Sequence, residues 1–598
     1  MPPQDRARVV CTNCHSRKIK CDLQTSSSGV CTHCRQSQQS CIRRVGARKT
    51  RATAARLRGP RSRPDHFSPT TNPEPLSPGT ASLHPVNTTP VGSGSTPSSQ
   101  TSRFVSRCSN SYYEELDNTT VVDECAFITS SRLQDAVLKS TQAHTLPRSV
   151  LLNARVDAYL KHAFHYCPVL EDSDLNGSAS ITLQKAVCLV GNLMRHDPRG
   201  PELANELYEE VKLLIYINYD KDTLQILKAL CLLSLWSAKP SNPITLDVPW
   251  HWIGVAVRLA FQMGLHRESA YVNQPDAKCL RRIFWTLYNS DTLEATCWNR
   301  PALLRRNDFD VELPTLDDFN ITNVQSLVFV ESSKLCTLIS RISVCCRDRQ
   351  SLQPQEFSKI EESLYAWASN LPEQVQLFDK NGKRKSYDRP VSELLIQYFT
   401  AVVLGEFLKY RDNGGPRRVS VVSLLAASCA TALYDEISCR DEAMFLTYHN
   451  AFYCLVLALP LIHHIPRCLE KQNLRERDLA ALQSILNGMN GRCGNAEWAI
   501  GRMQHLKTSI DRATNSQRSG NSDRLEPYVH ASRLFPFPSG FCENMALLEQ
   551  TIPTAEVTID NLDTLQNWPI DSNANYAWLD LFSFDVTDMG PDFGDGNN

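Results

Sequence analysis

The chain has 598 residues and nearly balanced charge, with 63 Lys and Arg against 64 Asp and Glu. This length exceeds what one hydrophobic core usually organises, and a hydrophobic fraction of 42% excludes a chain that is disordered throughout. The charges are unevenly placed: residues 1–63 carry 15 basic and two acidic residues, and no Lys or Arg follows Arg533. We therefore expect the basic first part of the chain to bind a polyanion and the acidic last part to bind a different partner.

Neither a signal peptide nor a membrane span is expected. The first ten residues contain no apolar segment of signal-peptide length. The longest apolar run, Ala451 to Ile462, contains Pro460 and is shorter than the roughly 20 residues that cross a bilayer. We therefore expect no membrane partner and a reducing compartment, where clustered cysteines among the 22 hold metal rather than form disulfides.

Six cysteines near the start follow a repeated pattern, C-x2-C-x6-C-x9-C-x2-C-x6-C. A C-x2-C pair places two thiolates on one metal, and tetrahedral zinc takes four ligands. Six thiolates satisfy two zinc ions only if two of them bridge. Because the segment is too short to fold by burial alone, metal binding would supply its folding free energy. The predicted zinc ligands are Cys11, Cys14, Cys21, Cys31, Cys34 and Cys41.

The alternatives are a set of unrelated cysteines and a single four-sulfur zinc ribbon, and the repeated spacing argues against both. His15 and His33 lie next to predicted ligands. Six sulfurs already complete the coordination of two ions, so neither histidine is expected to bind metal.

Arg17, Lys18 and Lys20 lie between the second and third cysteines, on what should be a short helix. Lys and Arg there can donate to guanine O6 and N7 in the major groove of double-stranded DNA. The alternative is a solvated basic turn, which fits poorly with a segment pinned by metal. Arg43 and Arg44 begin a further basic run that can neutralise phosphate or direct nuclear import.

The run CTNCHSRKIKCD from Cys11 to Asp22 resembles the fungal Zn2Cys6 binuclear cluster transcription factors, whose usual pattern is C-x2-C-R-x-R-K-x-K-C-D. This resemblance implies that Cys11 and Cys31 bridge the two ions. It also implies that Lys18 reads bases, typically in CGG triplets, while Arg17 and Lys20 support it at phosphates.

The chain departs from that pattern twice: His15 replaces the usual Arg, and residues 23–30 lack the common proline. We expect Gly29 to provide the loop's turn instead. Many family members dimerise through a coiled coil after the cluster, but residues 42–60 hold only three large aliphatic side chains, too few for such a seam. Monomeric binding and a homodimer formed through another region both stay open.

Composition divides the chain into four regions and predicts a mainly α fold. These are a Zn2Cys6 DNA-binding domain (1–45), a basic and then Pro/Ser/Thr-rich disordered linker (46–110), a helical regulatory domain (116–514) and a disordered acidic aromatic tail (550–598). Helical periodicity is clearest at Leu224 to Ser237, Trp252 to Met263, Arg281 to Leu293 and Leu394 to Tyr410.

Residues 155–320 resemble the family's regulatory domain, the fungal-specific or middle homology domain. The motifs that carry the resemblance are Tyr159-Leu160, Cys167-Pro168-Val169-Leu170, Ala256-Val257-Arg258-Leu259-Ala260, Gly264-Leu265-His266-Arg267, Arg281-Arg282-Ile283-Phe284-Trp285, Asp291, Asn299-Arg300-Pro301 and Leu313-Pro314. The family usually has Gly where Asn299 stands. The resemblance implies a domain that represses, receives an inducer or contacts partners, and an internal ligand pocket is one hypothesis.

No catalytic residues are predicted, because the G-x-S-x-G, Walker A and H-E-x-x-H patterns are all absent from the sequence. His266 is interpreted as a packing or hydrogen-bonding residue. Arg281 and Arg282 are expected to pair with acidic side chains rather than with a substrate.

Residues 551–598 interleave nine acidic residues with six aromatic ones. Acidic residues keep aromatic side chains exposed in a disordered segment, which can then fold into the groove of a transcriptional coactivator. The alternative is a merely solubilising tail, but such tails rarely carry this many aromatic residues.

Together these features predict a nuclear RNA polymerase II transcription factor that is not an enzyme. It would be an activator with two zinc ions per cluster, binding CGG-type sites and regulating metabolic or secondary-metabolite genes. The alternative is a zinc-dependent protein-interaction module of the ubiquitin-ligase kind, although RING spacing requires a longer gap and a His ligand. The third hypothesis is an enzyme that carries a DNA-binding segment, and the missing catalytic motifs argue against it.

Overall fold

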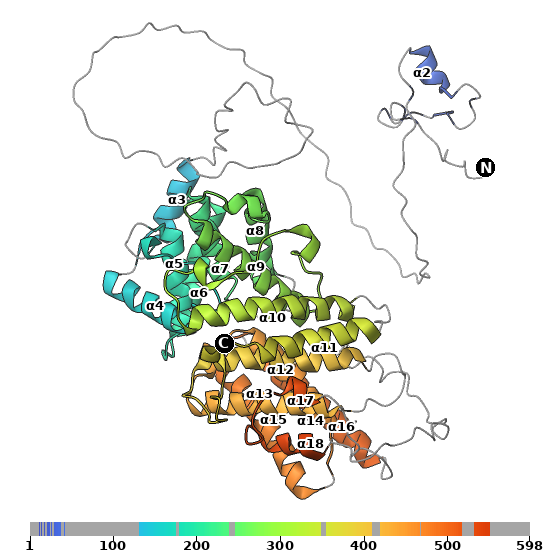
Figure 1. The fold of residues 1–598 in the computed structure, drawn as a ribbon. Helices are drawn as coiled ribbons and strands as arrows, with labels where there is room; N and C mark the ends of the chain where they lie inside the picture. Colours follow the sequence, from blue (N-terminus) through green and yellow to red (C-terminus); the bar gives the residue numbers. More distant parts are fainter. Residues whose placement is uncertain are drawn as a thin grey trace, which may run out of the picture. The chain divides into compact units, whose positions relative to one another are not determined.

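The computed structural model divides the chain into two compact units, Met1–Ser95 and Thr96–Asn598, which are treated separately below (Figure 1). In the first unit it describes residues 11, 14, 17, 19, 21–23, 26, 29–37 and 41. In the second it describes residues 131–550 except 147, 175–178, 238–244, 348–353, 410–418, 467 and 517–530. The predicted linker (46–110) and residues 551–598 of the predicted tail lie outside these ranges.

The second unit is built from helices, and its described residues contain no β-strand. Its first part consists of α3 (Ser131–Thr141), α4 (Ser149–His162), α5 (Ile181–Leu193), α6 (Gly200–Tyr216), α7 (Thr223–Leu233), α8 (Pro249–Gln262) and α9 (Ala277–Cys297). The rest consists of α10 (Val324–Arg347), α11 (Pro354–Ser369), α12 (Arg389–Lys409), α13 (Val421–Cys439), α14 (His449–His463), α15 (Leu469–Met489), α16 (Ala496–Ser516), α17 (Ala531–Leu534) and α18 (Ala546–Gln550).

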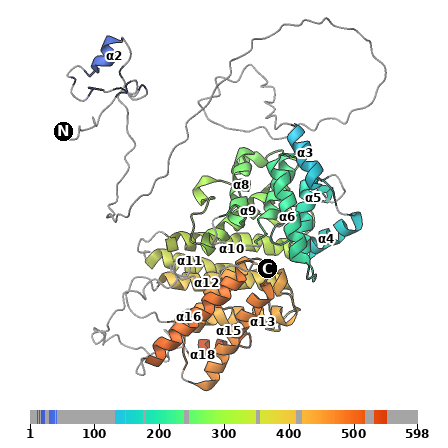
Figure 2. The ribbon, with the colours of Figure 1, turned by 180° about the vertical axis from the view of Figure 1, so that it is seen from behind.

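Short 3-10 turns join several of these helices. They are η2 (Glu268–Tyr271), η3 (Arg306–Asp308), η4 (Leu316–Asp318), η5 (Glu373–Val375), η6 (Ala443–Phe445) and η7 (Glu543–Met545). In both ribbon views α3–α9 gather at one end of the helical unit and α13–α18 at the other, with α10, α11 and α12 crossing between them (Figures 1 and 2).

Two hydrophobic cores follow this division. One is formed mainly by α4–α9, and the other mainly by α10–α16 with the segment that carries α17 and α18. Helix α10 contributes to both, since Phe329 and Cys336 lie in the first core while Leu335 and Ile339 lie in the second. Residues 531–550 also pack on the second core, so the helical unit continues past residue 514.

Local sequence explains where several helices begin. The side chains of Ser180, Asp222 and Ser420 cap α5, α7 and α13 by accepting hydrogen bonds from backbone N–H groups of the first turn. Helix α8 begins at Pro249, whose fixed φ suits the first turn and whose missing N–H leaves no donor unsatisfied there.

Helices α8 and α9 end in the same left-handed motif. Gly264 has φ +76°, its N–H donates to Phe261 and the N–H of Leu265 donates to Ala260. At the end of α9 the corresponding left-handed position is Asn299, with φ +50°. Asparagine is the residue that best replaces glycine in this conformation, so the departure from the family pattern at Asn299 is structurally tolerated.

All four segments with predicted helical periodicity lie in helices: Leu224 to Ser237 overlaps α7, Trp252 to Met263 overlaps α8, Arg281 to Leu293 lies inside α9, and Leu394 to Tyr410 overlaps α12. The predicted mainly α fold class is confirmed. Residues 238–244, between α7 and α8, lie outside the described residues.

Two helices are long and apolar enough to cross a membrane by length and composition, Arg389–Leu408 and Val421–Cys439. Sequence inspection for continuous apolar runs did not single them out. Their apolar windows are 94% and 78% buried inside the helical unit. This burial is what core helices of a large helical body show, because their apolar residues face neighbouring helices on all sides.

Candidate metal centre

The structure brings the six predicted ligand cysteines together. Two groups of four form, Cys11 with Cys14, Cys21 and Cys31, and Cys11 with Cys31, Cys34 and Cys41. Within each group all Sγ atoms lie within 4.8 Å of one another. The groups share Cys11 and Cys31, which are the two cysteines that the family resemblance implies as bridges.

The sulfur spacing suits zinc. The Sγ of Cys31 lies 3.8 Å from that of Cys11 and 3.6 Å from that of Cys14, and Cys11 Sγ lies 3.7 Å from Cys34 Sγ. Four sulfurs placed tetrahedrally around zinc with bonds of 2.3 Å are separated by about 3.8 Å. Soft thiolates in this arrangement are the donor set that zinc prefers, so the residues fit two zinc ions.

The repeat in the sequence is also a repeat in the structure. Backbone N–H groups of Cys11 and Cys31 donate to the sulfurs ten residues later, Cys21 and Cys41, at 3.4 and 3.3 Å. Those of Cys14 and Cys34 donate to the sulfurs three residues earlier, Cys11 and Cys31, at 3.3 and 3.4 Å. Each C-x2-C-x6-C half thus makes the same contacts, with a shift of twenty residues.

The pKa values of the two shared thiols shift in the opposite direction from those of Cys14 and Cys34. Burial opposes ionisation of Cys11, but the Cys14 N–H and the neighbouring sulfurs lower its pKa to about 6. The N–H of Cys34 lowers the pKa of Cys31. Burial instead raises the pKa of Cys14 and of Cys34. Backbone donors therefore favour negative charge at the two sulfurs that must contact both ions.

Asp22 links the two halves. Its Oδ1 accepts a hydrogen bond from the N–H of Thr32 at 2.9 Å, and its Oδ2 accepts one from the Thr32 hydroxyl. Both bonds lower the pKa of Asp22. Thr32 is the first residue of α2 (Thr32–Gln36), so the carboxylate also satisfies a donor at a helix start, where backbone N–H groups otherwise lack partners. Asp22 is the last residue of the family motif, and its role was not predicted from the sequence because Thr32 lies ten residues away.

The loop between the halves turns at Gly29, as predicted. Gly29 has φ +67°, and the Ser26 hydroxyl donates to the Val30 carbonyl at 2.8 Å. His33 is exposed and belongs to neither cysteine group; His15 lies outside the described residues.

Among the predicted DNA-binding residues, the structure describes one, Arg17, and exposes it. Its neighbour Ile19 is also exposed. Lys18, Lys20, Arg43 and Arg44 lie outside the described residues.

In the helical unit, Arg281 and Arg282 form ion pairs within the fold. Arg281 pairs with Glu268 at 2.6 Å and with Asp318 at 3.4 Å, and Arg282 pairs with Glu171. The expected pairing with acidic side chains is thereby confirmed. The His266 ring lies tilted against that of Phe261, at 4.8 Å between ring centroids, which agrees with its interpretation as a packing residue.

Two family models match the chain. Residues 9–50 match the fungal Zn(2)-Cys(6) binuclear cluster domain, which binds two zinc ions. Residues 156–369 match the fungal specific transcription factor domain, and this match contains nearly all of the motifs noted between residues 155 and 320.

Several curated proteins are similar to the chain. The acetamidase regulatory protein of Aspergillus fumigatus is 26% identical over 343 residues, which cover 52% of this chain and 43% of that protein. Cutinase transcription factor 1 alpha of Fusarium vanettenii is 25% identical over 561 residues, covering 77% of this chain and 59% of that protein. Transcriptional activator protein acu-15 of Neurospora crassa is 25% identical over 150 residues, covering 22% of this chain and 16% of that protein.

The chain thus spans under half of the length of the acetamidase regulatory protein that it matches. No solved structure matches it. The paired cysteine groups, the two family models and the relatives agree on one class of protein, which is not enzymatic. The chain carries the two domains of the fungal Zn2Cys6 binuclear cluster transcription factors, the zinc cluster domain in residues 9–50 and the fungal specific transcription factor domain in residues 156–369.

Proposed function

We propose that the protein is a nuclear, sequence-specific RNA polymerase II activator that binds CGG-type sites through its zinc cluster. The proposed domains are residues 1–45, 46–110 and 116–514, with residues 531–550 added to the helical domain because they pack on its second core, and an acidic tail of residues 551–598. The observation that carries it is the pair of four-cysteine groups that share Cys11 and Cys31. One zinc ion would be held by Cys11, Cys14, Cys21 and Cys31, and the other by Cys11, Cys31, Cys34 and Cys41.

The twenty-residue repeat supports the assignment of the DNA-reading half. The positions twenty residues after Arg17, Lys18 and Lys20 are their equivalents in the second half. They hold three uncharged residues, Ser37, Gln38 and Ser40. Two halves with the same metal scaffold therefore differ in charge at equivalent positions. At these three positions only the first half carries the cations that a guanine edge and phosphates attract. We assign base reading to Lys18 and phosphate contacts to Arg17, Lys20, Arg43 and Arg44.

The acidic aromatic segment of residues 551–598 would recruit coactivators. The Neurospora crassa relative is named a transcriptional activator, which supports an activating role. The names of the Aspergillus and Fusarium relatives refer to acetamidase and cutinase, which supports metabolic genes as the class of target. Monomer and homodimer are both compatible with this function.

The test of base reading compares Lys18→Ala with Gln38→Ala in the full-length chain, measured by fluorescence anisotropy on a CGG site and on scrambled DNA. Lys18→Ala should lose most of the discrimination, by about 1–3 kcal/mol, because each good base contact contributes that much. Gln38→Ala, at the equivalent position of the second half, should retain it. Equal weakening on both DNAs by Lys18→Ala would make Lys18 a phosphate contact. Absence of sequence preference in the unmodified chain would instead favour the zinc-dependent protein-interaction module.

The activating role has a separate test. Residues 551–598 fused to an unrelated DNA-binding domain should activate a reporter, and replacing Trp578 and Phe582 by Ala should abolish most of the signal. A fusion without activity would remove the activation assignment and leave the DNA-binding one intact.

A further inference from the structure

A cavity of about 70 Å³ lies in the helical unit where its two hydrophobic cores meet. Helices α9, α10, α12 and α14 supply most of its wall, together with the segment after α4. Leu293, which packs against both cores, and Val328 and Leu394 give it an apolar side. The rest of the lining is mostly polar, although it is deep in the protein. On the same scale a single water needs about 10–15 Å³, so the cavity holds several waters or one molecule of about five non-hydrogen atoms.

Asn289 on α9 brings an unpaired acceptor to this cavity. Its Nδ2 donates to Ser333 Oγ at 2.9 Å, and the Ser333 hydroxyl is itself committed as a donor to the Phe329 carbonyl at 2.9 Å. The orientation of the amide is therefore fixed, because Ser333 must accept from it. This leaves Asn289 Oδ1 buried without a hydrogen-bond partner among the described residues. An orphaned buried oxygen of this kind is costly unless a ligand or water donates to it.

His449 on α14 brings a second unpaired atom. Its side chain is 5% exposed, and its Nε2 has no partner in the described part of the chain. Burial lowers the pKa of His449 to about 3, so the ring is neutral at physiological pH. A neutral imidazole nitrogen accepts or donates according to its tautomer, and it therefore suits an uncharged polar group.

The one carboxylate in the lining, Glu393, is already neutralised. Arg389 donates to its Oε1, Tyr166 donates to its Oε2, and His165 Nε2 lies 3.5 Å from the same Oε2. Arg389 in turn donates to the His162 carbonyl at 2.8 Å. Because Glu393 and Arg389 are paired with each other, neither offers a free charge to a ligand, and desolvation would oppose the binding of a charged molecule.

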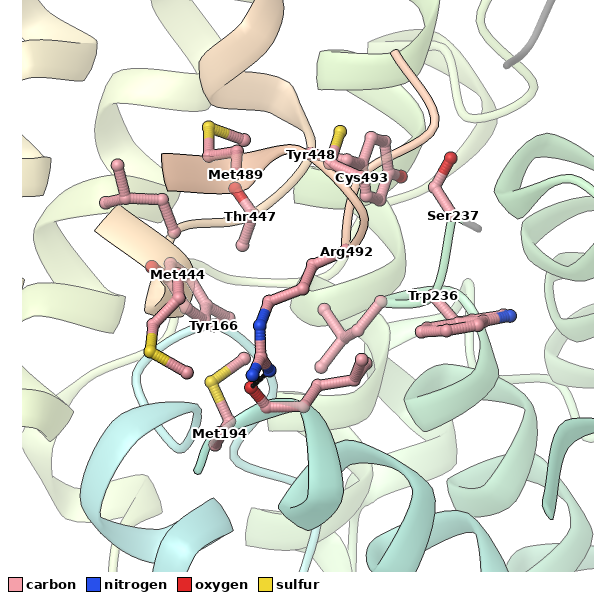
Figure 3. A pocket seen from close by; sticks show the side chains of 13 residues that line it. Tyr166, Met194, Trp236, Ser237, Met444, Thr447, Tyr448, Met489, Arg492 and Cys493 are labelled. Carbon is pink, nitrogen blue, oxygen red and sulfur yellow. Dashed lines mark hydrogen bonds between the residues drawn. The ribbon is translucent and has the colours of Figure 1, made fainter. Parts of the chain in front are cut away.

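A smaller neighbouring cavity of about 30 Å³ shares Tyr166, Leu235 and Thr447 with this one (Figure 3). These three shared residues are partly exposed, so the shared wall is the side on which solvent approaches. Arg492 reaches into the smaller cavity but donates to the carbonyls of Leu193, Arg195 and Asp197 at 2.7–3.1 Å (Figure 3). These hydrogen bonds occupy the Arg492 guanidinium at the end of α5, so it is not available to bind an anion. The smaller cavity would instead serve as a route to the larger one.

We propose that the cavity lined by Asn289 and His449 is an effector site for a small, uncharged polar molecule with an N–H or O–H donor. The donor would bind Asn289 Oδ1, and His449 Nε2 would pair with a second polar atom of the ligand. Because α9 and α10 meet α12 and α14 at this point, occupancy would stabilise the packing of the two cores against each other. The regulatory consequence rests on the proposed function, whereas the binding itself does not.

The experiment is saturation-transfer NMR on the full-length chain with three probes of similar size, neutral glycolamide, anionic glycolate and cationic ethanolammonium. Glycolamide should receive saturation and the two ions should not. Glycolamide has five non-hydrogen atoms, and the binding free energy available per atom limits its dissociation constant to the micromolar range or weaker. Each probe should therefore be used at millimolar concentration. Equal signals from all three probes, or none from glycolamide, would overturn the proposal and leave a cavity that holds water only.

Two variants localise the binding. His449→Phe keeps a ring but removes Nε2 and should weaken glycolamide binding about tenfold. Ser290→Leu, which fills the cavity from α9, should abolish it. His266→Phe is the matched control, because His266 also has a buried unpaired ring nitrogen but lies outside the cavity. Unchanged binding in both cavity variants would contradict the assignment. DNA binding to a CGG site, measured on the same samples, separates failure of this proposal from failure of the proposed function.

Discussion

The Sγ atoms of Cys11 and Cys31 lie 3.8 Å apart although twenty residues separate them, and both atoms belong to each of the two four-cysteine groups. A terminal cysteine such as Cys34 belongs to one group alone. The consequences of removing a shared and an unshared sulfur should therefore differ in kind.

The first prediction concerns zinc content. Cys34→Ser leaves the group of Cys11, Cys14, Cys21 and Cys31 complete and should retain about one zinc ion, since four sulfurs satisfy one ion. Cys31→Ser breaks both groups and should retain almost none. Elemental analysis of the purified chains after removal of loose metal distinguishes them. Equal zinc content in the two variants would argue against shared ligands.

The second prediction concerns Arg17, which is exposed beside the cluster. If Arg17 contacts a phosphate, Arg17→Ala should weaken binding to CGG and scrambled DNA alike. It should also reduce the slope of log affinity against log salt by about 0.9, the contribution of one released counterion. Ser37→Ala, at the equivalent position of the second half, is the control and should change neither quantity. A selective loss of CGG binding in Arg17→Ala would instead make Arg17 a base reader.

The third prediction concerns pH. Burial raises the pKa of Glu294 to about 7, well above its ordinary value of 4.5. The folded state therefore holds this proton more tightly than the unfolded state. The resulting stabilisation is fully present below about pH 4.5 and is lost as the pH rises through about 7.

Replacing Glu294 by Gln removes the buried charge while keeping the shape. At pH 8 the free energy of unfolding of the variant, measured with denaturant, should exceed that of the unmodified chain by about 2–3 kcal/mol. This gain in free energy should shrink toward pH 5. Glu206→Gln, on the exposed side of α6, should show no such trend. A Glu294→Gln gain that is independent of pH would contradict the raised pKa.

The fourth prediction concerns the end of α9, where Asn299 has φ +50°. Asn299→Gly should leave stability unchanged or raise it by up to about 1 kcal/mol, and Asn299→Val should lower it by about 1–2 kcal/mol, because a branched side chain resists the left-handed conformation. Asn487→Gly within α15 is the matched control and should destabilise by about 0.3–0.5 kcal/mol, since glycine has a lower helix propensity than asparagine. Denaturant unfolding of the three variants measures these differences.

Sequence reasoning was strongest where a local pattern determines the structure. The spacing of Cys11 to Cys41 predicted six thiolates on two zinc ions with two sulfurs shared, because C-x2-C pairs are local metal-binding patterns. The family resemblance implied that Cys11 and Cys31 are the shared pair, and the lack of a proline in residues 23–30 led to the expected turn at Gly29. Helices α7, α8, α9 and α12 were predicted for the same reason, since apolar periodicity is a property of one segment.

It was weakest where distant segments meet. His165, Asn289, Glu393 and His449 approach one cavity from four parts of the chain, and no local spacing connects them. The role of Asp22 was missed because its partner Thr32 is ten residues away, across the loop. Residues 531–550 were missed as part of the helical unit because their contribution to the second core depends on contacts with α11 and α13 rather than on their own periodicity.

The most direct test of the central claim is the number of zinc ions in the full-length chain, counted by native mass spectrometry. Two overlapping four-sulfur groups with two shared cysteines predict two ions per chain, released together when the chain is acidified because the shared thiolates protonate for both sites. A stoichiometry of one, with the remaining cysteines free or joined by disulfides, would contradict the binuclear cluster and the mode of DNA binding built on it.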